Sequence, residues 1–372
     1  MVRHIDLAAL PSPDVAGRLD RLRARFDGAG CDALVVTKLE SVRYLTGFTG
    51  SAAVVLVLPG SALLCTDGRY RDQVVAELDA SGAAVETEIA ARPDQLELVA
   101  RACGATARIG LEAASASWSL QRRLAEHLGE DRLVATDGLV EALRAVKDAG
   151  EVARIEAACD IADVAFAQVK SRLADGVTEA DFAAELEAEM RARGSAETSF
   201  ATIVASGPNA AMPHARPGGR VVGSGELVVV DFGATVDGYR SDMTRTLCVG
   251  ELSGELADLL DAVLAAQRAG IRAVRAGATG GDVDAACRGS LTEAGYGAAF
   301  VHATGHGVGL EIHEAPALAK GSTDILEPGA VVTVEPGAYL AGRGGARIED
   351  TLVVVGAAGS RPLTKSTKDY AI

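Results

Sequence analysis

The sequence predicts an α/β domain over residues 1–147 followed by an α+β domain over residues 148–372. Three observations support this fold class. The chain of 372 residues is longer than one hydrophobic core usually serves. Strand and helix patterns alternate in its first part, which is typical of a sheet covered by helices. A strongly helical stretch then leads into a part where strand-like runs dominate, and this change indicates a boundary near residue 147.

The first domain is expected to begin with a helix over residues 14–30, because apolar residues recur there with helical spacing and the stretch ends on glycine. Short apolar runs then alternate with helical patterns. The predicted strands cover residues 31–37, 51–58, 61–67, 108–112 and 132–138, and the predicted helices cover residues 69–81 and 117–129. This alternation favours an α/β sheet.

A strongly helical pattern is expected between residues 140 and 193, with one break at Asp148–Gly150, where the domain boundary is placed. Thr178 is a predicted helix N-cap, and Asp181 three residues later extends that signal. Strand-like runs follow at residues 201–206, 226–234, 240–250, 330–336 and 346–355, with helices at residues 253–276 and 281–294. We expect mostly antiparallel pairing in this domain.

The composition excludes several classes of partner. The formal charge of −15 at pH 7 argues against nucleic acid or an anionic membrane surface. The most apolar stretch, residues 52–65, is interrupted by Pro59 and Gly60, so no membrane span is expected. The N-terminus lacks a basic start followed by an apolar run, as a secretion signal would have. The six cysteines form no CxxC pair, which indicates reduced thiols in a cytoplasmic protein.

Two aspartates flank a predicted hairpin turn at Asp237-Gly238. If the hairpin centre lies between Val236 and Asp237, Asp231 and Asp242 are directly opposite, with Cβ atoms about 5 Å apart. Two opposed carboxylates destabilise a sheet, and a bound cation removes that cost. In the alternative interpretation the register differs and one aspartate caps a turn.

Two glutamates lie at apolar strand positions near the C-terminus. Glu335 ends a strand, and a turn is expected at Pro336-Gly337. Arg347 and Glu349 are two residues apart, so both point to one face. Either Arg347 is the ion-pair partner of Glu349, or Glu349 joins the other three carboxylates. Four carboxylates and a histidine would make a hard, oxygen-rich site for two divalent cations.

Histidine is concentrated in residues 302–316, which contain three of the six histidines of the chain: His302, His306 and His313. The glycines on either side of His306 are expected to crowd its backbone into a turn beside a metal. On a straight strand His306 and His313 would face opposite ways, so the chain must bend or the two have different roles. One histidine as ligand and two as proton donors would suit a hydrolase. His214, in a loop rich in glycine and proline, is expected near the same sheet.

These motifs occur in the order DFG with a second aspartate eleven residues later, HxxGHGxG…HE, EPG and RxED. This order resembles the pita-bread dinuclear metallopeptidases over about residues 150–357. That family includes methionine aminopeptidases, Xaa-Pro aminopeptidases and Xaa-Pro dipeptidases (prolidases). The stretches SVRYLTGFTGS and TDGRYRDQ resemble the N-terminal domain of the creatinase and prolidase branch. Creatinases lack the metal ligands, which this chain keeps, so the resemblance places it among the peptidases, and it implies a homodimer.

The resemblance also implies roles for individual residues. Two divalent metal ions would be bound by Asp231, Asp242, His306, Glu335 and Glu349. Glu335 would also accept the proton of the attacking water, His214 would contact the scissile amide, and His313 would stabilise the tetrahedral oxyanion. The substrate site would be completed by His302, Arg347 and Tyr339. Manganese is the metal favoured by the resemblance, with cobalt, zinc and iron as alternatives.

The expected reaction is hydrolysis of the bond between an N-terminal residue and proline, on peptides with proline in second position. Many prolidases carry an arginine shortly after the HE pair, where this chain has Ala317. Arg216, Arg343 or Arg347 could supply the charge instead, so dipeptide and longer-peptide substrates both remain open. The alternatives are a broad-specificity aminopeptidase of the same fold and a non-catalytic protein that binds a peptide or another partner.

Overall fold

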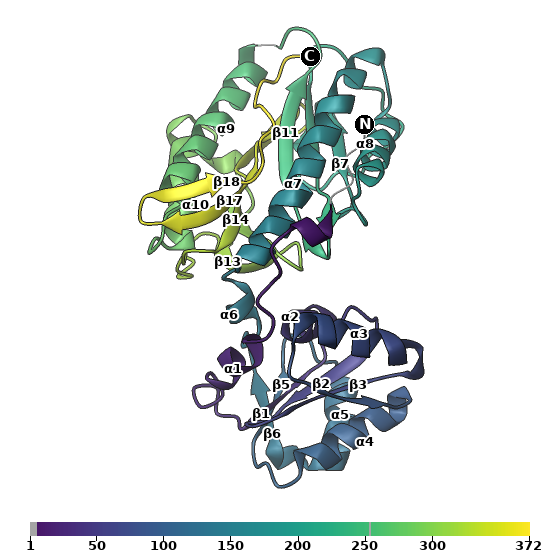
Figure 1. Cartoon of the computed structure of the whole chain (residues 1–372). Helices are drawn as coiled ribbons and strands as arrows, with labels where there is room; N and C mark the ends of the chain where they lie inside the picture. The colour runs from purple at the N-terminus through teal and green to yellow at the C-terminus, as the bar shows by residue number, and fades with distance from the viewer. Residues whose placement is uncertain (1–5, 253) are drawn as a thin grey trace. The chain divides into compact units, whose positions relative to one another are not determined.

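The computed structural model describes residues 6–252 and 254–372, with only the backbone of residues 92 and 93. The chain divides into two compact units (Figure 1). One is Pro13–Arg144, and the other joins the described residues before Pro13 to Ala145–Ile372. Those first residues lie with the second unit because Arg154 donates a hydrogen bond of 2.7 Å to the carbonyl of Pro11. Within the described residues, the helices are too short or too polar to cross a membrane.

The first unit contains a six-stranded sheet in the order β4-β3-β2-β1-β5-β6. Its strands are β1 Ala33–Val36, β2 Ala53–Val57, β3 Ala62–Thr66, β4 Glu86–Ile89, β5 Ile109–Glu112 and β6 Leu133–Thr136. Its helices are α1 Arg18–Arg23, α2 Leu39–Thr46, α3 Arg71–Ser81, α4 Arg92–Cys103, α5 Trp118–Leu128 and α6 Glu141–Arg144. The strand β2 is antiparallel to β1 and β3, and the other neighbouring strands are parallel.

The predicted strands of this unit are all present, and so are the predicted helices α3 and α5. Three further elements, β4, α2 and α4, were not predicted. The Glu-Thr-Glu sequence of β4 is exposed, so it carries no apolar signal. The helix expected over residues 14–30 is confined to α1, and turns follow it up to Gly30. All six cysteines of the chain are buried and unpaired, as expected for reduced thiols.

The helices of the second unit are α7 Ala149–Val169, α8 Glu179–Ala192, α9 Gly254–Ala273 and α10 Gly280–Glu293. The predicted interruption near residue 148 is the start of α7, where Asp148 and Glu151 form a reciprocal capping box. Thr178 caps α8 by accepting a hydrogen bond of 3.1 Å from the amide of Asp181, which confirms the predicted N-cap.

The strands of the second unit form two main sheets, β11-β8-β7 and β13-β12-β14-β17-β18, and two short ladders, β9-β10 and β15-β16. Their bounds are β7 Ile203–Ser206, β8 Leu227–Phe232, β9 Thr235–Val236, β10 Tyr239–Arg240, β11 Met243–Cys248, β12 Gly305–Gly307, β13 Glu314–Leu318, β14 Val331–Val334, β15 Gly337–Leu340, β16 Gly344–Arg347, β17 Asp350–Gly356 and β18 Gly359–Pro362. Every ladder between these strands is antiparallel, as predicted.

One face of each main sheet packs against a pair of helices (Figure 1). Val230 and Phe232 of β8 share a core with α7 and α8, and Val334 of β14 shares a core with α9 and α10. Side chains alternate along a strand, so Asp231 and Glu335, next to these core residues, point to the other face. Asp231 and Glu335 therefore face away from the helices, whereas Asp350 of β17 accepts a hydrogen bond of 2.9 Å from Gln267 of α9.

Candidate metal centre

The first hairpin places Asp231 and Asp242 on one face, though not directly opposite each other. Asp231 pairs with Thr244. Asp237 and Gly238 are themselves the turn, with φ values of 46° and 71°. The hairpin centre therefore lies one residue later than predicted, which shifts each partner by two residues. A shift of two preserves the face, so Asp242 is the diagonal neighbour of Asp231, and both line the same cavity.

The second hairpin brings Glu335 and Glu349 to matching positions. Its ladders β14-β17 and β15-β16 keep one register, because Val334 pairs with Asp350 and Gly337 pairs with Arg347. Between the two ladders, Glu335 follows β14 and Glu349 precedes β17, so the two residues occupy facing positions in the same register. The turn predicted at Pro336-Gly337 is wrong, since the chain reverses at residues 341–343. Proline has no N–H to donate, so it interrupts the ladder without reversing the chain.

His306 lies in the strand β12, between β13 and β14, so the turn predicted around it is also wrong. A Cβ atom at either neighbouring glycine would lie 2.1 Å from a backbone oxygen of an adjacent strand. The glycines thus allow three strands to approach closely. Of the two alternatives for His306 and His313, the structure shows the bend: the centroids of their rings lie 4.4 Å apart.

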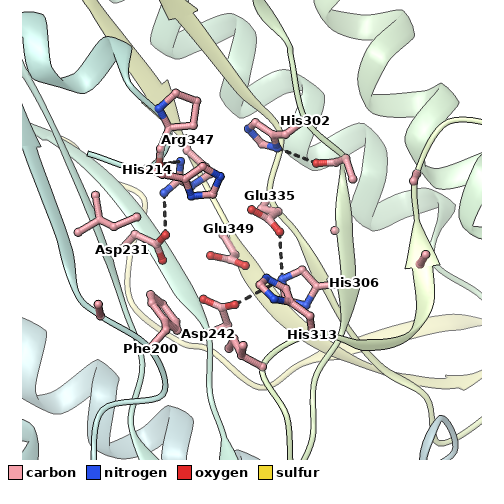
Figure 2. Close-up of a pocket in the computed structure, with 18 of the residues that line it drawn as sticks. Phe200, His214, Asp231, Asp242, His302, His306, His313, Glu335, Arg347 and Glu349 are labelled. Carbon is pink, nitrogen blue, oxygen red and sulfur yellow. Dashed lines mark hydrogen bonds and ion pairs between the residues drawn. The ribbon is translucent and has the colours of Figure 1, made fainter. Parts of the chain in front are cut away.

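These elements enclose a cavity of about 470 Å³ (Figure 2). Nine of the ten predicted site residues line it: His214, Asp231, Asp242, His302, His306, His313, Glu335, Arg347 and Glu349. Apolar side chains that sequence reasoning did not single out complete the wall: Phe200, Ile203 and Ile312. Nothing in their local sequence distinguishes them from core residues. Tyr339, the tenth predicted residue, lies behind Arg347 and His302.

The acidic side of the cavity is built like a cation site. Asp242, His306 and Glu349 each offer a ligand atom, and these atoms lie within 4.8 Å of one another. Nε2 of His306 lies 3.2 Å from Oε1 of Glu335 and 3.6 Å from Oδ2 of Asp242. Nδ1 of His306 donates a hydrogen bond of 3.0 Å to the carbonyl of Gly307. That bond fixes the ring so that Nε2 faces the carboxylates.

The pKa shifts of the carboxylates and of His306 indicate that the cavity holds more negative than positive charge. Burial and then the neighbouring carboxylates raise the pKa of Asp242 and Glu349 well above their ordinary values. Burial alone would lower the pKa of His306, but Glu335 and Asp242 outweigh it and raise the pKa of His306 to about 9. Burial alone would raise the pKa of Glu335, but the hydrogen bond and charge of His306 outweigh burial and lower that pKa. A divalent cation would relieve the repulsion that raises the pKa of Asp242 and Glu349.

Two orphaned oxygens also fit a metal. Oδ1 of Asp231 and Oε1 of Glu349 are buried and have no hydrogen-bond partner among the described residues. The other oxygen of each carboxylate is bound, by Nη2 of Arg347 at 2.6 Å and by Oγ1 of Thr244 at 2.9 Å. A buried carboxylate oxygen without a partner is costly, and oxygen ligands of this kind suit hard divalent cations. The residues therefore fit a site for such cations.

Arg347 pairs with Asp231, so the alternative in which it is the partner of Glu349 is wrong. Its Nη1 donates a hydrogen bond of 2.8 Å to the hydroxyl of Tyr339. That hydroxyl in turn donates to Nε2 of His302 at 2.9 Å, because Nδ1 of His302 must donate to the carbonyl of Ala303 at 2.7 Å. Burial lowers the pKa of His302, in agreement with this neutral tautomer. A hydrogen-bonded chain therefore connects Asp231 to His302.

Thr244 is a site residue that the sequence analysis missed. It accepts a hydrogen bond of 3.1 Å from Nε of Arg347 and donates one to Glu349. The side chains of Arg347 and Glu349, both of which line the cavity, are thereby joined through one hydroxyl. The signal in the sequence is its position two residues after Asp242, on the same face of an otherwise buried strand.

Known proteins resemble the chain over nearly its whole length. The family profile "Metallopeptidase family M24" matches residues 153–356, and the profile "Creatinase/Prolidase N-terminal domain" matches residues 18–146. An Xaa-Pro dipeptidase from Bacillus anthracis shares 40% identity, with a TM-score of 0.90 over 95% of this chain and 99% of that one. The X-Pro aminopeptidase from Thermotoga maritima shares 36% identity, with a TM-score of 0.83 over 92% and 98%. The uncharacterized peptidase YqhT of Bacillus subtilis is 37% identical, over 95% of this chain and 99% of its own length.

Proposed function

Because the chain belongs to metallopeptidase family M24, we propose that it hydrolyses the peptide bond between an N-terminal residue and proline. The observation that carries this proposal is the cavity in which four carboxylates and His306 converge. Two of the carboxylates, those of Asp231 and Glu349, each have a buried oxygen without a hydrogen-bond partner among the described residues. An Xaa-Pro dipeptidase and an X-Pro aminopeptidase are similar to 95% and 92% of this chain, which supports proline in the second position of the substrate.

The cofactor we propose is a pair of divalent metal ions, with manganese favoured and cobalt, zinc or iron as alternatives. Its ligands would be Asp231, Asp242, His306, Glu335 and Glu349. Divalent ions in such a site lower the pKa of water and polarise a carbonyl oxygen. The orphaned oxygens and the raised pKa values of Asp242 and Glu349 support this assignment.

The residues of the chain divide the remaining work. Glu335 has a lowered pKa, so it is ionised at neutral pH and can accept the proton of the attacking water. Burial and the neighbouring His306 lower the pKa of His313, so a neutral ring donates one N–H to the oxygen of the tetrahedral intermediate. His214, on the exposed side of the cavity, contacts the scissile amide.

The apolar wall formed by Phe200, Ile203 and Ile312 suits the pyrrolidine ring of proline, which has no N–H to satisfy. His302 and Arg347 line the same cavity and shape the substrate site. Tyr339 acts behind them, through its hydrogen bonds to both. We also propose that the protein is a cytoplasmic homodimer. Its buried free cysteines support a reducing compartment.

The direct test compares initial rates on Ala-Pro, Ala-Pro-Ala and Met-Ala-Ser with manganese-loaded protein and a chelator control. Cleavage of the two proline peptides, abolished by chelation, is the expected result. A preference between them distinguishes dipeptidase from aminopeptidase. Preferential cleavage of Met-Ala-Ser would instead indicate the broad aminopeptidase, and cleavage of none would indicate a protein that only binds peptides.

Arg216 is the arginine we propose to bind the carboxylate of a dipeptide. It is exposed, lines the cavity and forms no ion pair with the described residues. The other two candidate arginines already have carboxylate partners, because Arg347 forms an ion pair with Asp231 and Arg343 forms one with Glu255. The change Arg216→Ala should therefore raise KM for Ala-Pro by about tenfold, the worth of one charge-assisted hydrogen bond, and leave Ala-Pro-amide unaffected. The control is Arg343→Ala, and equal effects on both substrates would contradict the assignment.

A further inference from the structure

The exposed His214 ring makes no hydrogen bond with the described residues, so other contacts must determine its position. It belongs to residues 207–219, called here the His214 loop. A misplacement of about 1 Å at a catalytic site can cost about a hundredfold in rate. The contacts that order this loop therefore matter for the reaction.

We infer that Glu179 is the positioning residue for His214. This inference rests on the proposed function, since it concerns how His214 reaches the substrate. Glu179 is the first residue of α8, its side chain is fully buried, and its carboxylate forms no ion pair with the described residues. A buried carboxylate without a cation requires many hydrogen-bond donors.

The donors come from the two ends of the His214 loop and from Ser206, which directly precedes it. Oε1 of Glu179 accepts from the amide of Ser206 at 2.8 Å, from Oγ of Ser206 at 2.8 Å and from Nδ2 of Asn209 at 3.0 Å. Oε2 accepts from Nδ2 of Asn209 at 3.1 Å and from the amide of Gly218 at 3.3 Å. One carboxylate thus joins the residues just before and just after the part of the loop that carries His214.

The backbone at the start of α8 strengthens the same connection. The amide of Glu179 donates to the carbonyl of Arg220 at 2.9 Å, and the amide of Ala180 donates to the carbonyl of Gly218 at 3.0 Å. These amides have no partner inside the helix, because they belong to its first turn. The end of the loop is consequently bound both by donors and by an acceptor of α8.

The middle of the loop is located from the other side of the cavity. Nη1 of Arg347 donates to the carbonyl of Pro213 at 3.2 Å, and Ala215 packs in a small buried cluster with Ile203 and Ala205. These contacts flank His214 at positions 213 and 215. With both ends bound to Glu179, the imidazole is fixed over the cavity without a bond of its own (Figure 2).

The test is a double-mutant cycle with Glu179→Gln and His214→Ala, measured as kcat/KM on Ala-Pro. The amide of glutamine presents N–H groups where the loop also presents donors, so it should disorder the loop. We expect Glu179→Gln alone to lower kcat/KM by about tenfold to a hundredfold. In the His214→Ala background it should lower kcat/KM by less than about twofold, because the effects of two substitutions are not additive when one residue acts through the other. The metal content should stay unchanged, since Glu179 contacts none of the proposed ligands.

The matched control is Glu185→Gln, which removes the same charge from the same helix at a residue paired with Arg172 on the surface. If Glu179→Gln prevents folding, Asn209→Ala removes only the two bonds from Nδ2 and should give the same pattern with a smaller loss. Equal losses in both backgrounds, or loss of bound metal, would overturn the inference.

Hydrogen exchange separates this inference from the proposed function. Glu179→Gln should speed amide exchange across residues 206–218 and leave exchange of β8 unchanged, whether or not Ala-Pro is cleaved. Unaltered exchange in the loop would overturn the inference even if the peptidase activity is present. Absence of cleavage by the parent protein with faster exchange in the variant would count against the proposed function alone.

Discussion

Replacing Glu335 by glutamine is expected to lower kcat for Ala-Pro or Ala-Pro-Ala by about a thousandfold or more. Loss of a general base alone costs about a hundredfold to ten-thousandfold. Glu335 is also a proposed metal ligand, so the substitution weakens the site in a second way. The carboxylate lines the cavity, and its pKa is lowered by His306, so at neutral pH it is the ionised base that glutamine cannot replace.

Measurements of kcat and of bound metal on the same sample distinguish the two roles of Glu335. A large loss of kcat with both metal ions retained would identify proton transfer as its main contribution. A large loss with reduced metal content would identify ligation. The control is Glu327→Gln, an exposed glutamate shortly before β14 that should leave kcat within about twofold. Full activity of Glu335→Gln with bound metal would contradict the mechanism.

Apolar periodicity predicted the strands that carry the acidic residues, because most of their helix-covered positions are apolar, as Val228, Val230 and Phe232 of β8 show. It could not by itself determine the register. Asp237 and Gly238 are the two central residues of the turn, and both have positive φ. A turn centred on this pair places Asp231 opposite Thr244. The error of two residues was harmless because side chains alternate with a period of two.

Two features of the site lie beyond what pattern reasoning can supply. The strand β12 consists of Gly305, His306 and Gly307, so it has no apolar alternation, and only the close approach of its neighbours explains the glycines. Glu179 shows the same limit. In the sequence it is an ordinary acidic residue in the first turn of a helix, a position favoured by the helix dipole alone. Its contacts with residues 206–218 depend on tertiary structure that no local signal encodes.

Removal of the metal is expected to destabilise the second unit in a pH-dependent way. Saturating metal at about a hundredfold excess over its dissociation constant stabilises the folded state by about 2.7 kcal/mol per site. For a unit of this size that corresponds to a rise of about 5 to 10 °C in the unfolding midpoint. Scanning calorimetry of the chelated and the manganese-loaded protein measures this rise without reference to activity.

The pH dependence of the metal-free protein follows from the ionisation of the site. Burial and like charges raise the pKa of Asp242 and Glu349 above their values in the unfolded chain, so the folded state binds more protons than the unfolded state. Stability then falls as the pH rises above about 4, where the unfolded carboxyl groups ionise. His306 acts in the same direction. Its raised folded pKa stabilises the protein below about pH 6.5, and this contribution is lost as the pH rises through about 9.

The midpoint of the metal-free protein should therefore decrease between pH 5 and pH 9, and bound metal should reduce that decrease, because the ligands bind metal in their deprotonated forms. The net charge of −15 contributes its own repulsion at high pH. The variant Asp242→Asn corrects for this contribution, since it removes one buried charge and leaves the remaining charges in place. The unfolding midpoint of the metal-free variant should depend less on pH than that of the parent. Added metal should raise the midpoint of the variant only slightly. Equal pH slopes for parent and variant would show that the carboxylates do not repel one another in the folded protein, and the metal assignment would lose its electrostatic support.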